Sequence, residues 1–80
     1  MLDSIVVGRV IQRFREQKKQ SQELVSGLAG IGRTHLSAIE RGERKPTLET
    51  FFKIADALGV KPSEIMSAIE DEMKNISIKI

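Results

Sequence analysis

The chain has 80 residues, enough for one small domain, and its 40% hydrophobic and 30% charged residues are typical of a folded, soluble protein. The absence of cysteine excludes disulfides, thiolate metal sites and cysteine nucleophiles. The formal net charge is +2, but residues 1–45 hold nine Lys and Arg against five acids, whereas residues 46–80 hold four against six. This asymmetry indicates contact with a polyanion on one side of the molecule only.

Apolar side chains spaced three and four residues apart predict three helices in the first half of the chain. The first is capped by Asp3 or Ser4. The second lies within residues 21–30, with Ser21 as its N-cap, and the third within residues 32–42. The residues expected to face the core are Val7, Val10, Ile11, Phe14, Val25, Leu28, Ala29, Leu36 and Ile39.

Two further helices are predicted in the second half. Thr47 caps a fourth helix, which Gly59 stops, and Pro62 opens a fifth. The inward residues of these two helices are Leu48, Phe51, Ile54, Ala55, Leu58, Ile65, Ile69 and Met73. The last six residues, 75–80, alternate polar and apolar side chains, which predicts a short strand. The alternative is a frayed C-terminus, because chain ends are commonly disordered.

Few side chains are suited to catalysis or to metal binding. His35 is the only histidine, and a packed or phosphate-facing position suits it better than catalysis. The acids at 70–72 are consecutive, so a helix points them to three different sides. Gly27, Gly30 and Gly32 match no nucleotide-binding loop. The sequence therefore predicts no enzyme activity, no metal and no cofactor.

Residues 21–42 are the most informative segment, because two short helices joined by a glycine-containing turn are typical of a helix-turn-helix. Over residues 7–69 the chain resembles the Xre/Cro–cI family of bacterial and phage DNA-binding regulators. The matching positions are Gly8, Ile11, Phe14, Arg15, Ser21, Gln22, Val25, Ala29, Gly30, Leu36, Ser37, Ile39, Glu40, Arg41, Gly42, Pro46, Thr47, Leu48, residues 54–60 and Pro62. Two positions depart from the family pattern: Gln20 stands where an apolar residue is usual, and Leu24 where a charged one is frequent.

The resemblance implies an all-α, five-helix fold of the lambda repressor type, with the third helix as the recognition helix. Residues 1–74 would form the DNA-binding domain, with its helix-turn-helix at 21–41, and residues 75–80 a tail available as a dimerisation strand. The resemblance also implies a partly buried salt bridge between Arg15 and Glu40 that ties the first helix to the end of the third.

Four residues of the third helix are expected to face DNA bases, because they lie opposite, beside or flanking its inward stripe: Arg33, Thr34, Ser37 and Ala38. Arg33 could hold guanine O6 and N7 with two N–H groups, and the methyl of Thr34 or Ala38 could contact a thymine methyl. The alternative is that these are merely exposed polar positions.

Phosphate contacts are expected from free N–H groups at the start of the second helix and from cations near the third. The residues expected to face phosphate are Ser21, Gln22, His35, Arg41, Arg44 and Lys45. For Arg44 and Lys45 the alternative is a plain solvated charge.

The function predicted is sequence-specific binding of double-stranded DNA by a homodimeric transcriptional regulator, on a palindromic operator. The residues expected at the dimer interface are Ile65, Met66, Ile69, Met73, Ile76, Ile78 and Ile80. No small-molecule ligand and no membrane contact are expected. With neither a signal peptide nor a membrane span, the protein is expected to be cytoplasmic, of bacterial or phage origin, and on the nucleoid when bound. The alternative function is an antitoxin-like protein-binding module of the same fold.

Overall fold

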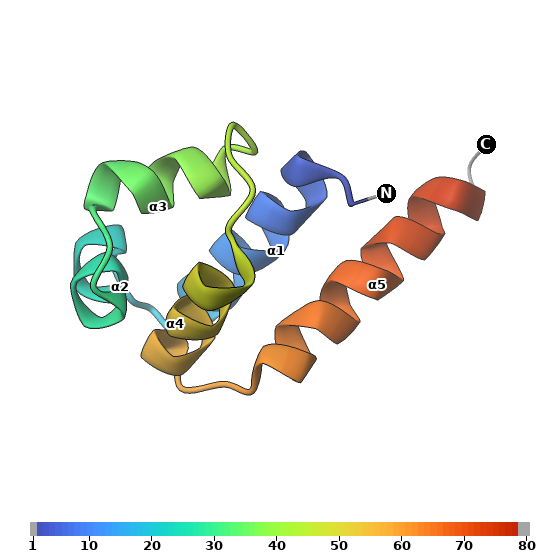
Figure 1. Cartoon of the computed structure of the whole chain (residues 1–80). Coiled ribbons are helices and arrows are strands. Elements are labelled where there is room, and N and C mark those ends of the chain that lie inside the picture. Colours follow the sequence, from blue (N-terminus) through green and yellow to red (C-terminus); the bar gives the residue numbers. More distant parts are fainter. Residues whose placement is uncertain (1, 79–80) are drawn as a thin grey trace.

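The computed structural model describes residues 2–78, and the side chains of residues 2–75. Within this part the chain forms five helices and no strand, which confirms the predicted all-α fold (Figure 1). The helices are α1 (Ser4–Gln17), α2 (Gln22–Ala29), α3 (Arg33–Glu40), α4 (Leu48–Leu58) and α5 (Pro62–Ile78). None of the described helices is both long and apolar enough to cross a membrane.

The helix ends lie where the capping residues predicted them. The side chains of Asp3, Ser21 and Thr47 accept hydrogen bonds from the first free backbone N–H groups of α1, α2 and α4. Gly30 and Gly59 end α2 and α4 with φ of 72° and 71°, a left-handed conformation that glycine adopts without steric cost.

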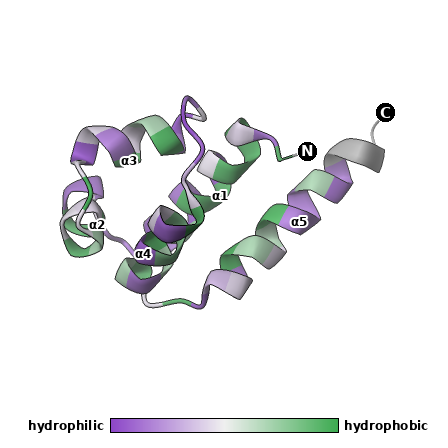
Figure 2. Cartoon of the chain, viewed as in Figure 1, coloured by the Kyte–Doolittle hydropathy of each residue, from purple (hydrophilic) through white to green (hydrophobic). Residues whose placement is uncertain are grey.

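The helices enclose one hydrophobic core, with α1 packed against α3 and α5, and α2 packed against α3 and α4. Hydrophobic and hydrophilic residues are interspersed along the helices, as amphipathic helices require (Figure 2). The buried core residues are Val6, Val7, Val10, Ile11, Val25, Ala29, Leu36, Ile39, Phe51, Ile54, Ala55, Leu58, Ile65 and Ile69.

Two residues expected in the core lie on the surface instead. Leu28 is 62% exposed, because its neighbours Val25 and Ala29 already fill the inward side of the two-turn helix α2. Leu48 is 73% exposed, because it is the first residue of α4 and lies at the edge of the core.

The strand predicted for residues 75–80 is wrong over the described part of that segment, because α5 continues through Ile78. A single strand leaves its backbone N–H and C=O groups unpaired, whereas a helix pairs them within itself. Residues 79–80 lie outside the described part of the chain. α5 packs along α1 as far as Glu72 and Met73, where Arg13 Nη1 of α1 lies 3.1 Å from Glu72 Oε1 and Met73 packs against the core, and only the end of α5 projects beyond the other helices (Figure 1).

Candidate nucleic-acid interface

The segment from α2 to α3 is a helix-turn-helix of two eight-residue helices. Gly30 reverses the chain, and the backbone N–H of Ile31 donates to the Ser26 carbonyl at 3.0 Å. Gly32 then serves as the N-cap of α3. Because Ile31 packs against the core, the turn holds the two helices in a fixed relative orientation.

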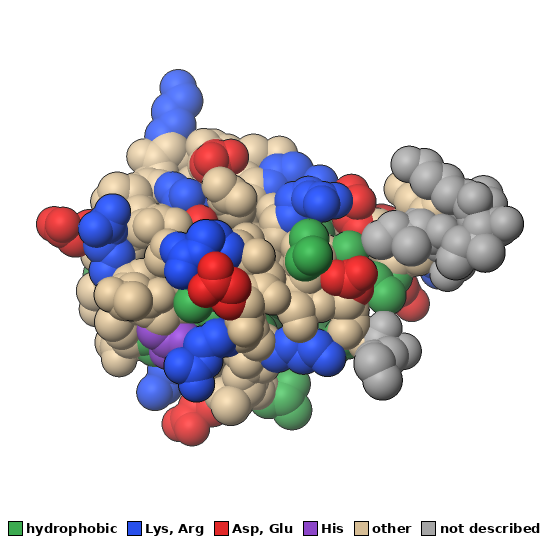
Figure 3. All heavy atoms as spheres, turned by 90° about the horizontal axis from the view of Figure 1, so that it is seen from above, with side chains coloured by type: hydrophobic (Ala, Val, Ile, Leu, Met, Phe, Trp, Pro, Cys, Tyr) green, Lys and Arg blue, Asp and Glu red, His purple; other side chains and the backbone are tan. Residues whose placement is uncertain are grey.

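The start of α3 presents exposed side chains suited to DNA bases. Arg33 and Thr34 are both exposed, and Arg33 lines a polar hollow together with Ser21 and Gln22 at the start of α2. Figure 3 looks down on the α3 side of the molecule, where Lys and Arg side chains are spread over the face with Asp and Glu side chains among them. The two residues expected first along the recognition helix are therefore accessible to a duplex.

The other two expected base-facing residues are less available. Ala38 is only 9% exposed, so its methyl offers little surface to a thymine. At the backbone, the Ala38 carbonyl accepts from the Glu43 N–H at 2.9 Å in the turn that ends α3. Ser37 is half-buried, and its hydroxyl accepts a hydrogen bond from Arg41.

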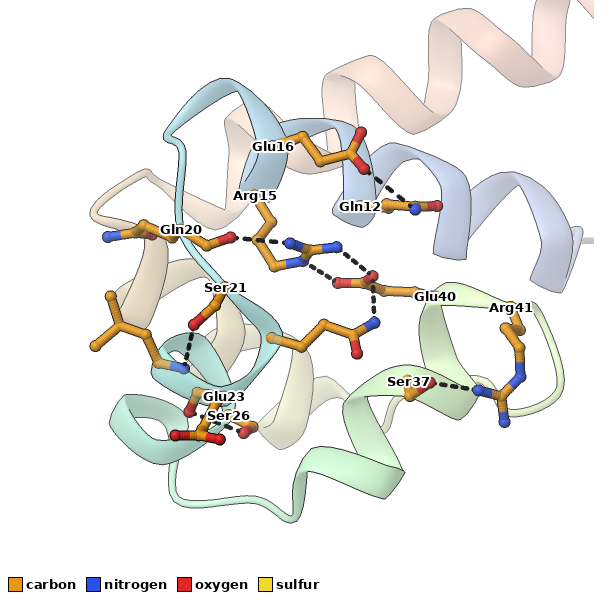
Figure 4. A network of polar contacts seen from close by, with 12 residues as sticks. Gln12, Arg15, Glu16, Gln20, Ser21, Glu23, Ser26, Ser37, Glu40 and Arg41 are labelled. Carbon is orange, nitrogen blue, oxygen red and sulfur yellow. Dashed lines mark hydrogen bonds and ion pairs between the residues drawn. The ribbon is translucent and has the colours of Figure 1, made fainter.

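Arg15 and Glu40 meet as the resemblance implied (Figure 4). Arg15 donates from Nε to Glu40 Oε2 at 2.7 Å and from Nη2 to Oε1 at 3.0 Å. A third donor, Arg15 Nη1, reaches the backbone carbonyl of Gln20 at 2.9 Å. The hydrogen bonds to Glu40 raise the pKa of Arg15, because they stabilise the charged guanidinium.

Gln22, which is expected to face phosphate, also belongs to this network. Its Nε2 donates to Glu40 Oε1 at 2.9 Å, which engages one of the two N–H groups of the side-chain amide. Glu40 is almost fully enclosed, and a buried carboxylate needs several donors to offset lost hydration. The sequence does not show which way the Gln22 side chain points, nor that Glu40 is buried and needs hydrogen-bond donors.

The remaining expected phosphate contacts are distributed around α2, α3 and the loop that follows. Ser21 is exposed, with its hydroxyl accepting from the Leu24 N–H at 3.0 Å as the cap of α2. His35 is half-buried, whereas Arg44 and Lys45 are exposed.

Arg41 is exposed, as expected, but it carries an ion pair that sequence reasoning missed. Its Nε lies 2.8 Å from Glu43 Oε2 and its Nη2 lies 3.0 Å from Glu43 Oε1. The spacing of these residues gives no signal for the pair, because it depends on the turn at Gly42, whose φ is 80°.

The residues expected at the dimer interface divide into two groups. Ile65 and Ile69 are 0% and 1% exposed within the chain's own core, so they offer no surface to a second copy. Met66 is 38% exposed and Met73 is half-buried, while the side chains of Ile76, Ile78 and Ile80 lie outside the described part.

An apolar hollow of about 180 Å³ lies beside Met66. Its other lining residues are Leu2, Val7, Lys45, Pro46, Leu48, Phe51 and Ile69. A second hollow, lined by Leu2, Met66 and Met73, adjoins it along α5. Among the described residues, no three His, Asp or Glu side chains are grouped to hold a metal ion.

Comparison with known proteins places this arrangement in a family. The Helix-turn-helix family model matches residues 11–65. The uncharacterized HTH-type transcriptional regulator y4dJ of Sinorhizobium fredii is 36% identical over 66 residues, 82% of this chain and 86% of that protein. Control protein C.BamHI of Bacillus amyloliquefaciens is 35% identical over 63 residues, 78% of each chain.

Solved structures agree with this placement. The restriction-modification controller protein C.AhdI of Aeromonas hydrophila superimposes with a TM-score of 0.77 at 32% identity, over 81% of this chain and 98% of that one. The clp gene regulator ClgR of Corynebacterium glutamicum reaches a TM-score of 0.90 over 99% of this chain and 84% of that one, and its 19% identity supports the fold alone. The chain therefore belongs to the helix-turn-helix family of Xre/Cro–cI-type transcriptional regulators, which bind double-stranded DNA and are not enzymes.

Proposed function

We propose that this chain binds a specific DNA sequence as a homodimer and regulates transcription from that site. The observation that carries the proposal is the exposed start of α3, where Arg33 and Thr34 stand clear of the core on a helix fixed by the Arg15–Glu40 pair. A recognition helix that enters the major groove contacts base edges with its N-terminal residues.

Arg33 is the residue best suited to read a base. Its guanidinium can donate two parallel hydrogen bonds to O6 and N7 of a guanine, a pattern that no other base pair offers in the major groove. Thr34, one position further, can place its methyl against a thymine or its hydroxyl on a base edge. The Ser37 oxygen accepts from Arg41, so its O–H is the group that can donate to an acceptor on a base edge.

The sequence-independent part of binding falls to the groups around α3. Arg44 and Lys45 extend from the α3–α4 loop, and the backbone N–H groups at the start of α2 lie beside Arg33 in the same polar hollow. Cations and helix N-termini of this kind hold phosphate oxygens and fix the register of a protein on the duplex.

A second copy of the chain is the proposed occupant of the apolar hollows beside α5. Leu2, Leu48 and Met66 are exposed there by 46%, 73% and 38%, a grouping of large apolar side chains that water disfavours. Lys45 and Pro46 of the α3–α4 loop line the same hollow, so an interface here adjoins the DNA-facing loop. A two-fold axis at this surface would bring two recognition helices to one side, spaced about 34 Å for adjacent major grooves.

Selection of bound sequences from a library of random duplexes tests the proposal. We expect one palindromic sequence to be enriched and sedimentation to give a dimer. With about 6–10 phosphates neutralised, log K should fall against log[salt] with a slope of about −5 to −9. Binding that does not change with salt would exclude the DNA-binding function. A monomer that binds no duplex would favour the antitoxin-like protein-binding alternative.

A further inference from the structure

Arg41 lies at the end of α3 and forms an ion pair with Glu43. Both side chains are on the surface, 53% and 59% exposed, and both carboxylate oxygens receive an N–H from the guanidinium. A further N–H, from Nη1, goes to the hydroxyl of Ser37 one turn back along α3 (Figure 4). The pair therefore lies along the exposed side of the recognition helix.

The two charges stabilise each other although solvent surrounds them. The hydrogen bonds from Arg41, and then its charge, lower the pKa of Glu43, while the same contacts raise the pKa of Arg41. Exposed pairs of this kind are nevertheless weak, because water and salt screen them and two long side chains must be held still. Another anion can therefore displace the carboxylate.

A DNA phosphate is the anion that competes for the same edge of Arg41. Carboxylate and phosphate both offer two oxygens that match the parallel N–H groups of a guanidinium. We propose that Glu43 limits the DNA affinity of this chain by holding Arg41 in an internal ion pair that a phosphate must break. The inference rests on the proposed function, since it concerns the strength of that DNA contact.

Glu43 is singled out by its surroundings. Of the cationic side chains expected to face phosphate, Arg41 is paired with a carboxylate. Arg44 and Lys45 form no ion pair with any of the described residues. Glu40, the other acid at this end of α3, is enclosed and held by Arg15. Removing the Glu43 charge should therefore release one more cation for phosphate binding.

The test compares DNA binding of Glu43→Gln and Glu43→Ala with the unaltered chain across a salt series, on a random-sequence duplex and on the selected duplex. Each variant should bind both duplexes more tightly, with a salt slope steeper by about 1.8, the value for one added phosphate contact in each protomer of the dimer. Its advantage should accordingly grow about twelvefold on going from about 200 mM to about 50 mM salt. Asp56→Asn, an exposed site on α4, is the control for the same change in net charge.

A second experiment repeats Glu43→Gln in an Arg41→Ala background. There the gain in DNA affinity from Glu43→Gln should fall to the gain that Asp56→Asn gives. An undiminished gain in that background would overturn the inference, because the effect would then be general charge. Unchanged or weaker binding by both Glu43 variants would also overturn it while leaving the proposed function intact. Absence of salt-dependent DNA binding by the unaltered chain would overturn both. Circular dichroism melts check that each variant is folded.

Discussion

Arg15 of α1 and Glu40 at the end of α3 form a two-point ion pair inside the protein, with the carboxylate only 2% exposed and the guanidinium 12% exposed. The pair does more than join two helices, because Arg15 also holds the Gln20 carbonyl and Glu40 also holds the Gln22 amide. Four contacts thus connect α1, the turn that follows it, the start of α2 and the end of the recognition helix. The orientation of α3 depends on this network.

Breaking the pair on one side should be costly. Arg15→Met leaves a buried carboxylate with only Gln22 as a donor, and Glu40→Leu leaves the guanidinium without its charge partner. Each change should lower the free energy of unfolding by about 3–5 kcal/mol, and the double variant Arg15→Met/Glu40→Leu should recover much of that loss. Urea unfolding measures all three, and single variants as stable as the starting chain would contradict a buried pair.

Gly8 of α1 lies against the end of α3 so closely that no side chain fits. A Cβ at this position would meet the backbone carbonyl oxygen of Ile39 and lie 2.6 Å from that of Glu40. Backbone atoms at the end of a helix cannot move aside as a flexible side chain can. Gly8→Ala should therefore destabilise the fold by about 1–3 kcal/mol, despite the better helix propensity of alanine.

Gly27 provides the matched control within α2. It is also inside a helix, but a Cβ there would meet nothing within 4 Å. Gly27→Ala should raise the free energy of unfolding by about 0.5–1 kcal/mol. Opposite signs for the two variants in thermal melts would confirm the close approach of α1 to α3, and equal signs would contradict it.

Gln20 carries the one buried side-chain atom left without a hydrogen-bond partner in the described part of the chain, its Oε1. Such an orphaned acceptor costs about 1–3 kcal/mol. Gln20→Leu, which restores the apolar residue usual for the family, should stabilise the protein by about 1 kcal/mol. The backbone carbonyl that Arg15 uses is unaffected. A loss of stability in a urea titration would show that the amide has a partner in solution.

Local chemistry predicted most of the fold. The helix starts are predicted by residues whose side-chain oxygen accepts from free backbone N–H groups: Asp3, Ser21 and Thr47. The helix ends are predicted by glycines, which adopt positive φ without steric cost: Gly30 and Gly59. These signals depend on neighbours within a few residues, so they can be read from sequence. The five helices and most of the core follow from them together with the apolar spacing.

The features of the site that the sequence does not show depend on contacts between distant segments. Gln22 donates to Glu40, 18 positions later, and Ala38 is buried by packing that the spacing within α3 does not determine. The tail pattern at 75–80 satisfies strand spacing, but pairing requires a partner strand that this chain does not offer among its described residues. In each case the outcome depends on which distant segments are close in space, which the residue spacing along the chain does not show.

Arg33 and Arg44 should respond differently to truncation. Arg33→Ala should cost about 1–3 kcal/mol of binding per half-site and relax the preference at one base position, because the contact proposed for it is to a base edge. Arg44→Ala should weaken binding by a similar factor on every sequence and make the salt slope of the dimer about two units shallower, one for each protomer. Competition binding with the selected duplex and single-base variants distinguishes the two. Equal weakening by Arg33→Ala on all sequences would assign it to the DNA backbone.

Met66 is the residue through which dimerisation is best tested, because it lines both apolar hollows beside α5. A charge introduced by Met66→Glu would have to be buried without a partner on association, so we expect the dimer to dissociate at concentrations where the unaltered chain is dimeric. Ser67→Glu is the matched control, since this neighbouring α5 residue is exposed and lines neither hollow. Sedimentation equilibrium gives the dissociation constants. If Met66→Glu dimerises as tightly as Ser67→Glu, the apolar hollows do not form the interface, and a second copy must associate through another surface.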